Sequence, residues 1–216
     1  HISGDDRKKI SDKELLFVGG TNLLNLANIR AQWKIRPTDI KYYAKRCVLL
    51  GVGSSSYNKK ASDETKFILK NVLSDTYMHS VRDEYTKELL NGIGFENVTN
   101  TCCPTTWNLT PDKIKWTCKG SMAVTTITDY SEDIINDGKM LRNLLANYNS
   151  VHIWIQSIRD ITYLKKLLSG DEYDNLFLIS PSLEAYRHFL DLNQYNLDYI
   201  GTRLHAGIFA MQRNIR

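Results

Sequence analysis

The stretch of sequence that decides the fold is Asp198-Tyr199-Ile200-Gly201-Thr202-Arg203-Leu204-His205-Ala206-Gly207. Its first residues belong to a predicted short strand (196–200), the Gly-Thr pair predicts a tight turn, and a helix is predicted from Arg203 onward. The apolar residues at helical spacing that support this helix are Leu204, Ile208 and Met211. A strand that passes through a tight turn into a helix is the building unit of α/β sheets.

The same unit recurs along the chain. Apolar runs that predict strands are 15–20, 47–53, 77–81, 97–102, 122–127, 151–155 and 176–179. Helices are predicted over 62–73, from the residues after Arg82 to Leu90, and over 132–146, 158–168 and 183–190. In the first helix the predicted core residues are Phe67, Ile68 and Val72. Continuous apolar strands alternating with helices indicate an α/β fold with helices on both faces of a parallel sheet.

A polar, Trp-containing stretch interrupts this alternation and predicts a linker at 105–120. We therefore expect two Rossmann-like domains, at 1–104 and 121–216, that face a ligand-binding cleft. The chain begins with His1 rather than methionine and ends at Arg216, just after a helix that should lead into another strand. We expect a polypeptide that is truncated at both ends, with an incomplete second domain.

Composition narrows the class of protein. The formal charge is +4, from 28 basic and 24 acidic residues, and the basic residues are scattered, which argues against a nucleic-acid partner. No apolar run reaches membrane-spanning length, and no signal-peptide pattern is present. The four cysteines, Cys47, Cys102, Cys103 and Cys118, form no Cys-x-x-Cys pair. We therefore expect no metal site and a thiol-reduced, cytoplasmic protein, with Cys47 in the core.

Arg203 and His205 are the predicted catalytic residues. Strand ends in open α/β sheets face ligands, and helix N-termini attract anions, so Thr202 is expected to contact substrate as well. Arginine offers a planar fork for carboxylate or phosphate, and histidine can transfer a proton near neutral pH. The alternative is structural: an Arg-x-His at the start of a buried helix could simply pair with a nearby carboxylate.

Other strand ends carry candidate substrate-binding residues, namely Gly19, Gly20, Thr21, Asn22, Gly53, Ser54 and Arg82. Glycine lets backbone amides approach an anion, and the hydroxyls after Gly53 could contact a sugar, whereas the alternative is a turn or a flexible loop. Neither glycine loop has the dinucleotide-binding or P-loop pattern. Arg82 offers a second cationic fork or, alternatively, a structural salt bridge. Structural or surface roles are expected for His79, His152 and His188, although His79 could line the cleft.

Four motifs in this order make the chain resemble the polysaccharide pyruvyl transferase family: Gly-Gly-Thr-Asn-Leu-Leu, Leu-Leu-Gly-Val-Gly-Ser, Ser-Val-Arg-Asp-Glu-Tyr and Gly-Thr-Arg-Leu-His-Ala-Gly. The resemblance runs from about residue 14 to the end. It implies two domains in a GT-B-like arrangement, with the acceptor on the N-terminal side and the donor on the C-terminal side. It also implies an enzyme that transfers the enolpyruvyl unit of phosphoenolpyruvate to a sugar of a bacterial cell-surface polysaccharide or its precursor, forming a pyruvate ketal.

The resemblance further places Arg203 and His205 in the Arg-Leu-His donor site and Arg82 in the Arg-Asp-Glu motif. His205 would then protonate the donor or contact its phosphate, the arginines would stabilise donor charge, and Asp83 is the candidate base. Phosphoenolpyruvate is the donor substrate, no cofactor is implied, and the acceptor would be a sugar or a lipid-linked glycan. An oligomer is compatible with the sequence. Two alternatives stay open: a GT-B glycosyltransferase using a nucleotide sugar, and a non-catalytic glycan-binding protein.

Overall fold

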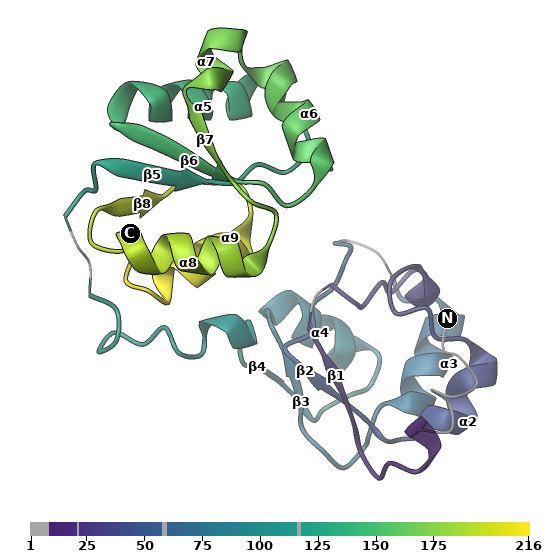
Figure 1. Ribbon diagram of the computed structural model, residues 1–216. Helices are drawn as coiled ribbons and strands as arrows, with labels where there is room; N and C mark the ends of the chain where they lie inside the picture. Colours follow the sequence, from purple (N-terminus) through teal and green to yellow (C-terminus); the bar gives the residue numbers. More distant parts are fainter. Residues whose placement is uncertain (1–8, 21, 58–59, 116–117) are drawn as a thin grey trace. The chain divides into compact units, whose positions relative to one another are not determined.

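The computed structural model describes residues 9–20, 22–57, 60–115 and 118–216. The chain forms two compact units, one ending at Trp107 and the other running from Asn108 to Arg216. Both units consist of parallel strands joined by helices (Figure 1). The prediction of an α/β protein with parallel sheets is therefore confirmed.

In the first unit, short parallel strands pair two by two. Its strands are β1 (Leu16–Gly19), β2 (Cys47–Leu50), β3 (His79–Val81) and β4 (Val98–Asn100). β1 pairs with β2, β3 pairs with β4, and a parallel bridge between Val52 and Val81 joins the two pairs. All these strands therefore end at one shared carboxyl edge.

Two helices of the first unit begin at polar side-chain caps. The helices of this unit are α2 (Ile40–Tyr43), α3 (Asp63–Val72) and α4 (Glu84–Gly92), with short 3₁₀ turns at Ile29–Ala31, Pro37–Asp39 and Pro104–Thr106. Ser62 accepts a hydrogen bond from the backbone N–H of Thr65 and so starts α3, and Asp83 starts α4 in the same way. Such caps satisfy N–H groups that have no partner within the helix.

The second unit alternates strands and helices without interruption. Its elements are β5 (Met122–Thr125), α5 (Ile134–Asn147), β6 (Ser150–Trp154), α6 (Ile158–Leu167), α7 (Gly170–Asp174), β7 (Leu176–Ile179), α8 (Leu183–Asn193), β8 (Leu197–Tyr199) and α9 (Leu204–Met211). All strand pairs are parallel, in the order β7-β6-β5-β8. Helices α5 and α6 cover one face of the sheet, and α8 and α9 cover the other (Figure 1).

Most predicted elements lie where the sequence analysis places them, but the core assignment of Phe67 is wrong. Ile68 and Val72 of α3 are fully buried, as predicted, whereas the Phe67 side chain is 55% exposed. Ile208 of α9 is buried, whereas Leu204 is 68% exposed. Ala206 and Ala210 occupy the buried face of α9 instead, because this helix packs closely enough for small residues to fill the contact.

Among the described residues, no helix is long and apolar enough to cross a lipid bilayer. The predicted linker falls partly outside the described residues, which omit 116 and 117. Cys47 is fully buried at the start of β2, as expected for a core cysteine. Burial raises the pKa of its thiol to about 12.

His79 is a core residue, in agreement with its expected structural role. It is fully buried at the start of β3. Its Nδ1 accepts a hydrogen bond from the Leu49 N–H at 3.2 Å, so Nε2 carries the proton and donates to the Ser74 carbonyl at 2.9 Å. Burial lowers the pKa of His79, which keeps the ring neutral.

We predict that the first unit loses stability as the pH falls below about 6.5, the ordinary histidine pKa. The unfolded chain then binds a proton that folded His79 rejects, so stability should fall by up to about 1.4 kcal/mol per pH unit. Hydrogen exchange of core amides between pH 7.5 and 5 measures this slope. His79→Gln should flatten it and His188→Gln, at an exposed position of α8, should not; an unchanged slope in His79→Gln would contradict the assignment.

Candidate functional site

The strand order of the second unit places a ligand position beside β5. From β5 the chain moves through β6 to β7, and then returns to the opposite side of β5 at β8. The strands β5 and β8 are therefore neighbours, and the loops after them (126–133 and 200–203) leave the sheet side by side at its carboxyl edge and then separate. In open α/β sheets, ligands bind at such a switch point, outside the carboxyl ends of the strands.

Gly201 lets these two loops come together. A Cβ atom at this position would lie 2.7 Å from the backbone nitrogen of Thr126 and 2.8 Å from the Tyr199 hydroxyl, so no larger residue fits without a shift. The Thr202 N–H then donates to the Thr126 carbonyl at 3.0 Å. The turn predicted from the Gly-Thr pair therefore brings the backbone of the loop after β8 into contact with the backbone of the loop after β5.

Tyr199 fixes the start of α9. Its hydroxyl donates to the Arg203 carbonyl at 2.8 Å and is 2.6 Å from the Thr126 hydroxyl. A Cβ atom at Gly207 would lie 2.7 Å from the Tyr199 ring, so this glycine makes room for the aromatic side chain against the helix. Burial raises the pKa of Tyr199, so the hydroxyl stays protonated and able to donate.

Arg203, the N-cap residue of α9, lies at the centre of a network of hydrogen bonds and ion pairs. Its Nε donates to the Ile127 carbonyl at 2.6 Å, and its Nη2 lies 2.9 Å from one carboxylate oxygen each of Asp129 and Asp160. The Arg203 side chain is 16% exposed, and the two carboxylates are 5% and 2% exposed. The pairing with carboxylates that the sequence left open is therefore present.

Each carboxylate has further partners. Asp160, in the first turn of α6, also accepts hydrogen bonds from the backbone N–H groups of Gln156 and Ser157 at 2.7 and 3.0 Å. The second oxygen of Asp129 lies 3.0 Å from Nε of Arg159, whose side chain is 74% exposed. One buried network thus joins the loops after β5, β6 and β8.

His205 and Thr202 lie at the surface of the same edge. The residues on either side of Arg203 in the motif are exposed, and His205 belongs to the first turn of α9. The Thr202 hydroxyl is 2.8 Å from that of Thr128. The motif therefore combines a partly buried arginine, which holds the loops, with an exposed histidine that solutes can reach.

We predict that Arg203→Gln lowers the free energy of unfolding of the second unit by about 3–5 kcal/mol, because it leaves two buried carboxylates without their shared cation. Arg203→Lys should lose less, since lysine keeps the charge but cannot reproduce the fork. Urea unfolding followed by hydrogen exchange of second-unit amides measures the loss. Arg187→Gln removes an exposed ion pair on α8 and serves as the control; equal stability of the two variants would refute the anchoring role.

In the first unit, Arg82 follows β3, and its side chain packs against the backbone of Gly53. A Cβ atom at Gly53 would lie 2.2 Å from Nε of Arg82, so the glycine leaves the space that this side chain occupies. Nε of Arg82 is also 3.4 Å from Asp83, and the Arg82 side chain is 22% exposed. Asp83 caps α4 by accepting from the Thr86 N–H and hydroxyl at 2.7 and 2.6 Å. Its carboxylate is thus occupied in the helix cap.

The remaining predicted residues follow β1 and β2 at the carboxyl edge of the first unit. Gly20 has a φ of +98°, which agrees with the alternative that this glycine serves a turn, whereas Gly19 is the last residue of β1. Ser54 donates to the Leu24 carbonyl at 3.1 Å. Thr21 lies outside the described residues. Among the residues that the structure describes, the buried side-chain oxygens of Asn22, Ser55 and Ser56 have no hydrogen-bond partner, so this edge retains unsatisfied polar groups.

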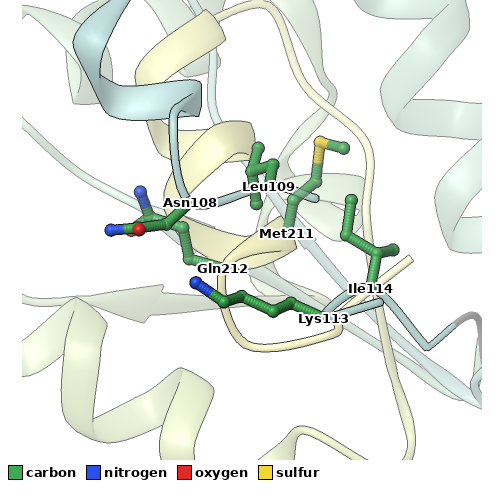
Figure 2. A pocket seen from close by; sticks show the side chains of 6 residues that line it. All are labelled: Asn108, Leu109, Lys113, Ile114, Met211 and Gln212. Carbon is green, nitrogen blue, oxygen red and sulfur yellow. The ribbon is translucent and has the colours of Figure 1, made fainter. Parts of the chain in front are cut away.

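Two pockets of about 270 Å³ lie in the second unit, and neither is lined by Arg203 or His205. One adjoins the C-terminal end of α9 and is lined by Asn108, Leu109, Lys113, Ile114, Met211 and Gln212 (Figure 2). The other, mostly apolar, lies where β6 and β7 end. In the part of the chain that the structure describes, no three His, Cys, Asp or Glu side chains gather as metal ligands would.

Comparison with known proteins defines the class. The family model described as polysaccharide pyruvyl transferase matches residues 2–216, so the chain belongs to the polysaccharide pyruvyl transferase family. Members of this family are enzymes that act in polysaccharide biosynthesis, and the suspected resemblance is confirmed. No curated protein and no solved structure matches the chain.

Sequence reasoning proposed Arg203 and His205 as site residues but missed the carboxylates that pair with Arg203. Asp129 and Asp160 are 74 and 43 residues from Arg203 in the sequence. One local signal was available, because Ser157 and Asp160 have the spacing of a capping box and so mark the start of α6. Nothing comparable marks Asp129 or Arg159.

Proposed function

We propose that this chain transfers the enolpyruvyl unit of phosphoenolpyruvate to a sugar of a bacterial cell-surface polysaccharide or its precursor, and closes a pyruvate ketal across two hydroxyls. The observation that carries the proposal is the exposed His205 beside the buried Arg203 network, at the switch point of the second unit. Membership of the family supports the reaction class. The acceptor is a sugar or a lipid-linked glycan.

The chemistry needs an acid at a position that the donor can reach. A proton is delivered to the methylene carbon of phosphoenolpyruvate, which becomes a methyl group and leaves the adjacent carbon electrophilic. A sugar hydroxyl attacks that carbon and loses its proton. The bond from that carbon to the phosphate oxygen then breaks and releases inorganic phosphate, which takes up a proton, and a second hydroxyl adds to the carbon and loses its proton to close the ketal. His205 is the proposed proton donor, because an imidazolium can give up a proton near neutral pH.

Arg203 is best described as a positioning residue in this scheme. Its bonds to Ile127, Asp129 and Asp160 hold the turn from which His205 extends. Two carboxylates already compensate the charge of Arg203. A direct contact between Arg203 and the donor is therefore not needed for this role and stays a prediction. Arg82 is the proposed donor-charge ligand of the first unit, where Asn22, Ser54 and the glycines after β1 and β2 are proposed to contact substrate.

The arrangement of the two units and the cellular compartment are part of the same proposal. Two Rossmann-like units suit a GT-B-like arrangement, which this family resemblance implies. The four cysteines of the chain form no Cys-x-x-Cys pair. This cysteine usage supports a reducing compartment, and we propose the cytoplasm.

The direct test is to incubate the protein with phosphoenolpyruvate and a panel of sugars and glycolipids. We expect phosphate release together with an acceptor product that has gained a pyruvate ketal by mass. Release of a nucleotide from a nucleotide sugar would instead indicate a glycosyltransferase. Glycan binding without phosphate release or product from any acceptor would indicate a non-catalytic protein.

We predict that His205→Asn lowers the single-turnover rate by roughly 10²–10⁴-fold, because asparagine keeps hydrogen bonding but has no proton to transfer. Binding of phosphoenolpyruvate, measured by calorimetry, should change much less. A parallel loss of binding would make His205 a phosphate ligand instead. His188→Asn, at another exposed histidine, is the matched control; a normal rate in folded His205→Asn would remove His205 from the reaction.

A further inference from the structure

Arg159 is an exposed guanidinium attached to the buried Arg203 network. It lies in the first turn of α6, where the chain enters the helix after β6. Its Nε is 3.0 Å from Asp129, and its side chain remains 74% exposed. Asp129 therefore lies between two guanidinium groups, one buried and one facing solvent.

The charge balance of this network favours a donor contact through Arg159 rather than Arg203. Arg203 is 16% exposed and shares its charge between two carboxylates. Arg159 engages a single carboxylate through Nε, and the planar guanidinium carries four further N–H groups on its two Nη atoms. Such a fork matches a carboxylate or phosphate in two-point contact.

We propose that Arg159 binds the anionic group of the donor, a carboxylate or phosphate, at the carboxyl edge of the second unit. This inference rests on the proposed function, in which the donor is phosphoenolpyruvate and His205 is on the same edge. Asp129 forms an ion pair with the guanidinium on the Nε side, and the N–H groups on the two Nη atoms are left to the ligand. Arg159 thus supplies in the second unit the exposed cation that the buried Arg203 does not.

Steady-state kinetics with phosphoenolpyruvate test this assignment. Arg159→Gln should raise the KM for the donor about ten- to a hundredfold with a much smaller change in kcat, since the lost contact binds ground state and transition state alike. Arg159→Lys should show a smaller increase, because it keeps the charge without the fork. Arg187→Gln, a half-exposed arginine on α8, is the matched control and should leave KM unchanged.

A second comparison excludes a purely structural role, in which Arg159 serves only to compensate Asp129. Arg159→Gln is repeated in an Asp129→Asn background, where no charge needs compensation. The same fold increase in KM is expected if Arg159 binds the donor. Loss of the increase in that background, or an unchanged KM in the single variant, would overturn the assignment.

Calorimetry with phosphoenolpyruvate and with inorganic phosphate separates this inference from the proposed function. If the wild-type protein consumes no phosphoenolpyruvate with any acceptor, the proposed function fails. At least tenfold weaker anion binding by Arg159→Gln than by wild type would still support the anion site. Equal binding by the two proteins, or no binding by either, would overturn it.

Discussion

The second unit depends on one interaction, the shared bonding of the Arg203 guanidinium to Asp129, Asp160 and the Ile127 carbonyl. Buried carboxylates such as Asp129 and Asp160 are tolerated only when they are paired, and removing their shared cation leaves both uncompensated. The three partners come from the loop after β5 and from the start of α6, so the network fixes both against the start of α9. The position of His205 follows from that arrangement.

Close backbone approach is the second constraint, and it explains the glycines of the motif. Gly201 leaves space for the backbone of Thr126, and Gly207 leaves space for the ring of Tyr199. The Tyr199 hydroxyl then donates to the carbonyl of Arg203, the N-cap residue of α9. Gly53 does the same for Arg82 in the first unit. In each case a glycine makes space for a side chain or backbone next to a candidate functional residue.

The sequence was sufficient to predict the strands, the main helices and the strand–turn–helix that carries Arg203, because apolar runs and turn residues are local signals. It was insufficient for the network, because Asp129 and Asp160 are distant in sequence and adjacent only through the sheet order β6-β5-β8. Helix orientation was a further limit. In α3 the buried face is formed by Ile68, Leu69 and Val72, which leaves Phe67 exposed. In α9 Ala206 and Ala210 face the core and Leu204 does not.

A double-mutant cycle between Arg203 and Asp160 tests the central claim most directly. The free energy of unfolding of the second unit is measured by hydrogen exchange in wild type, Arg203→Gln, Asp160→Asn and the double variant. The account predicts a coupling energy of about 2 kcal/mol or more, because either single change breaks the same buried pair. Additive effects, with coupling below about 0.5 kcal/mol, would show that the network does not hold this edge of the sheet together.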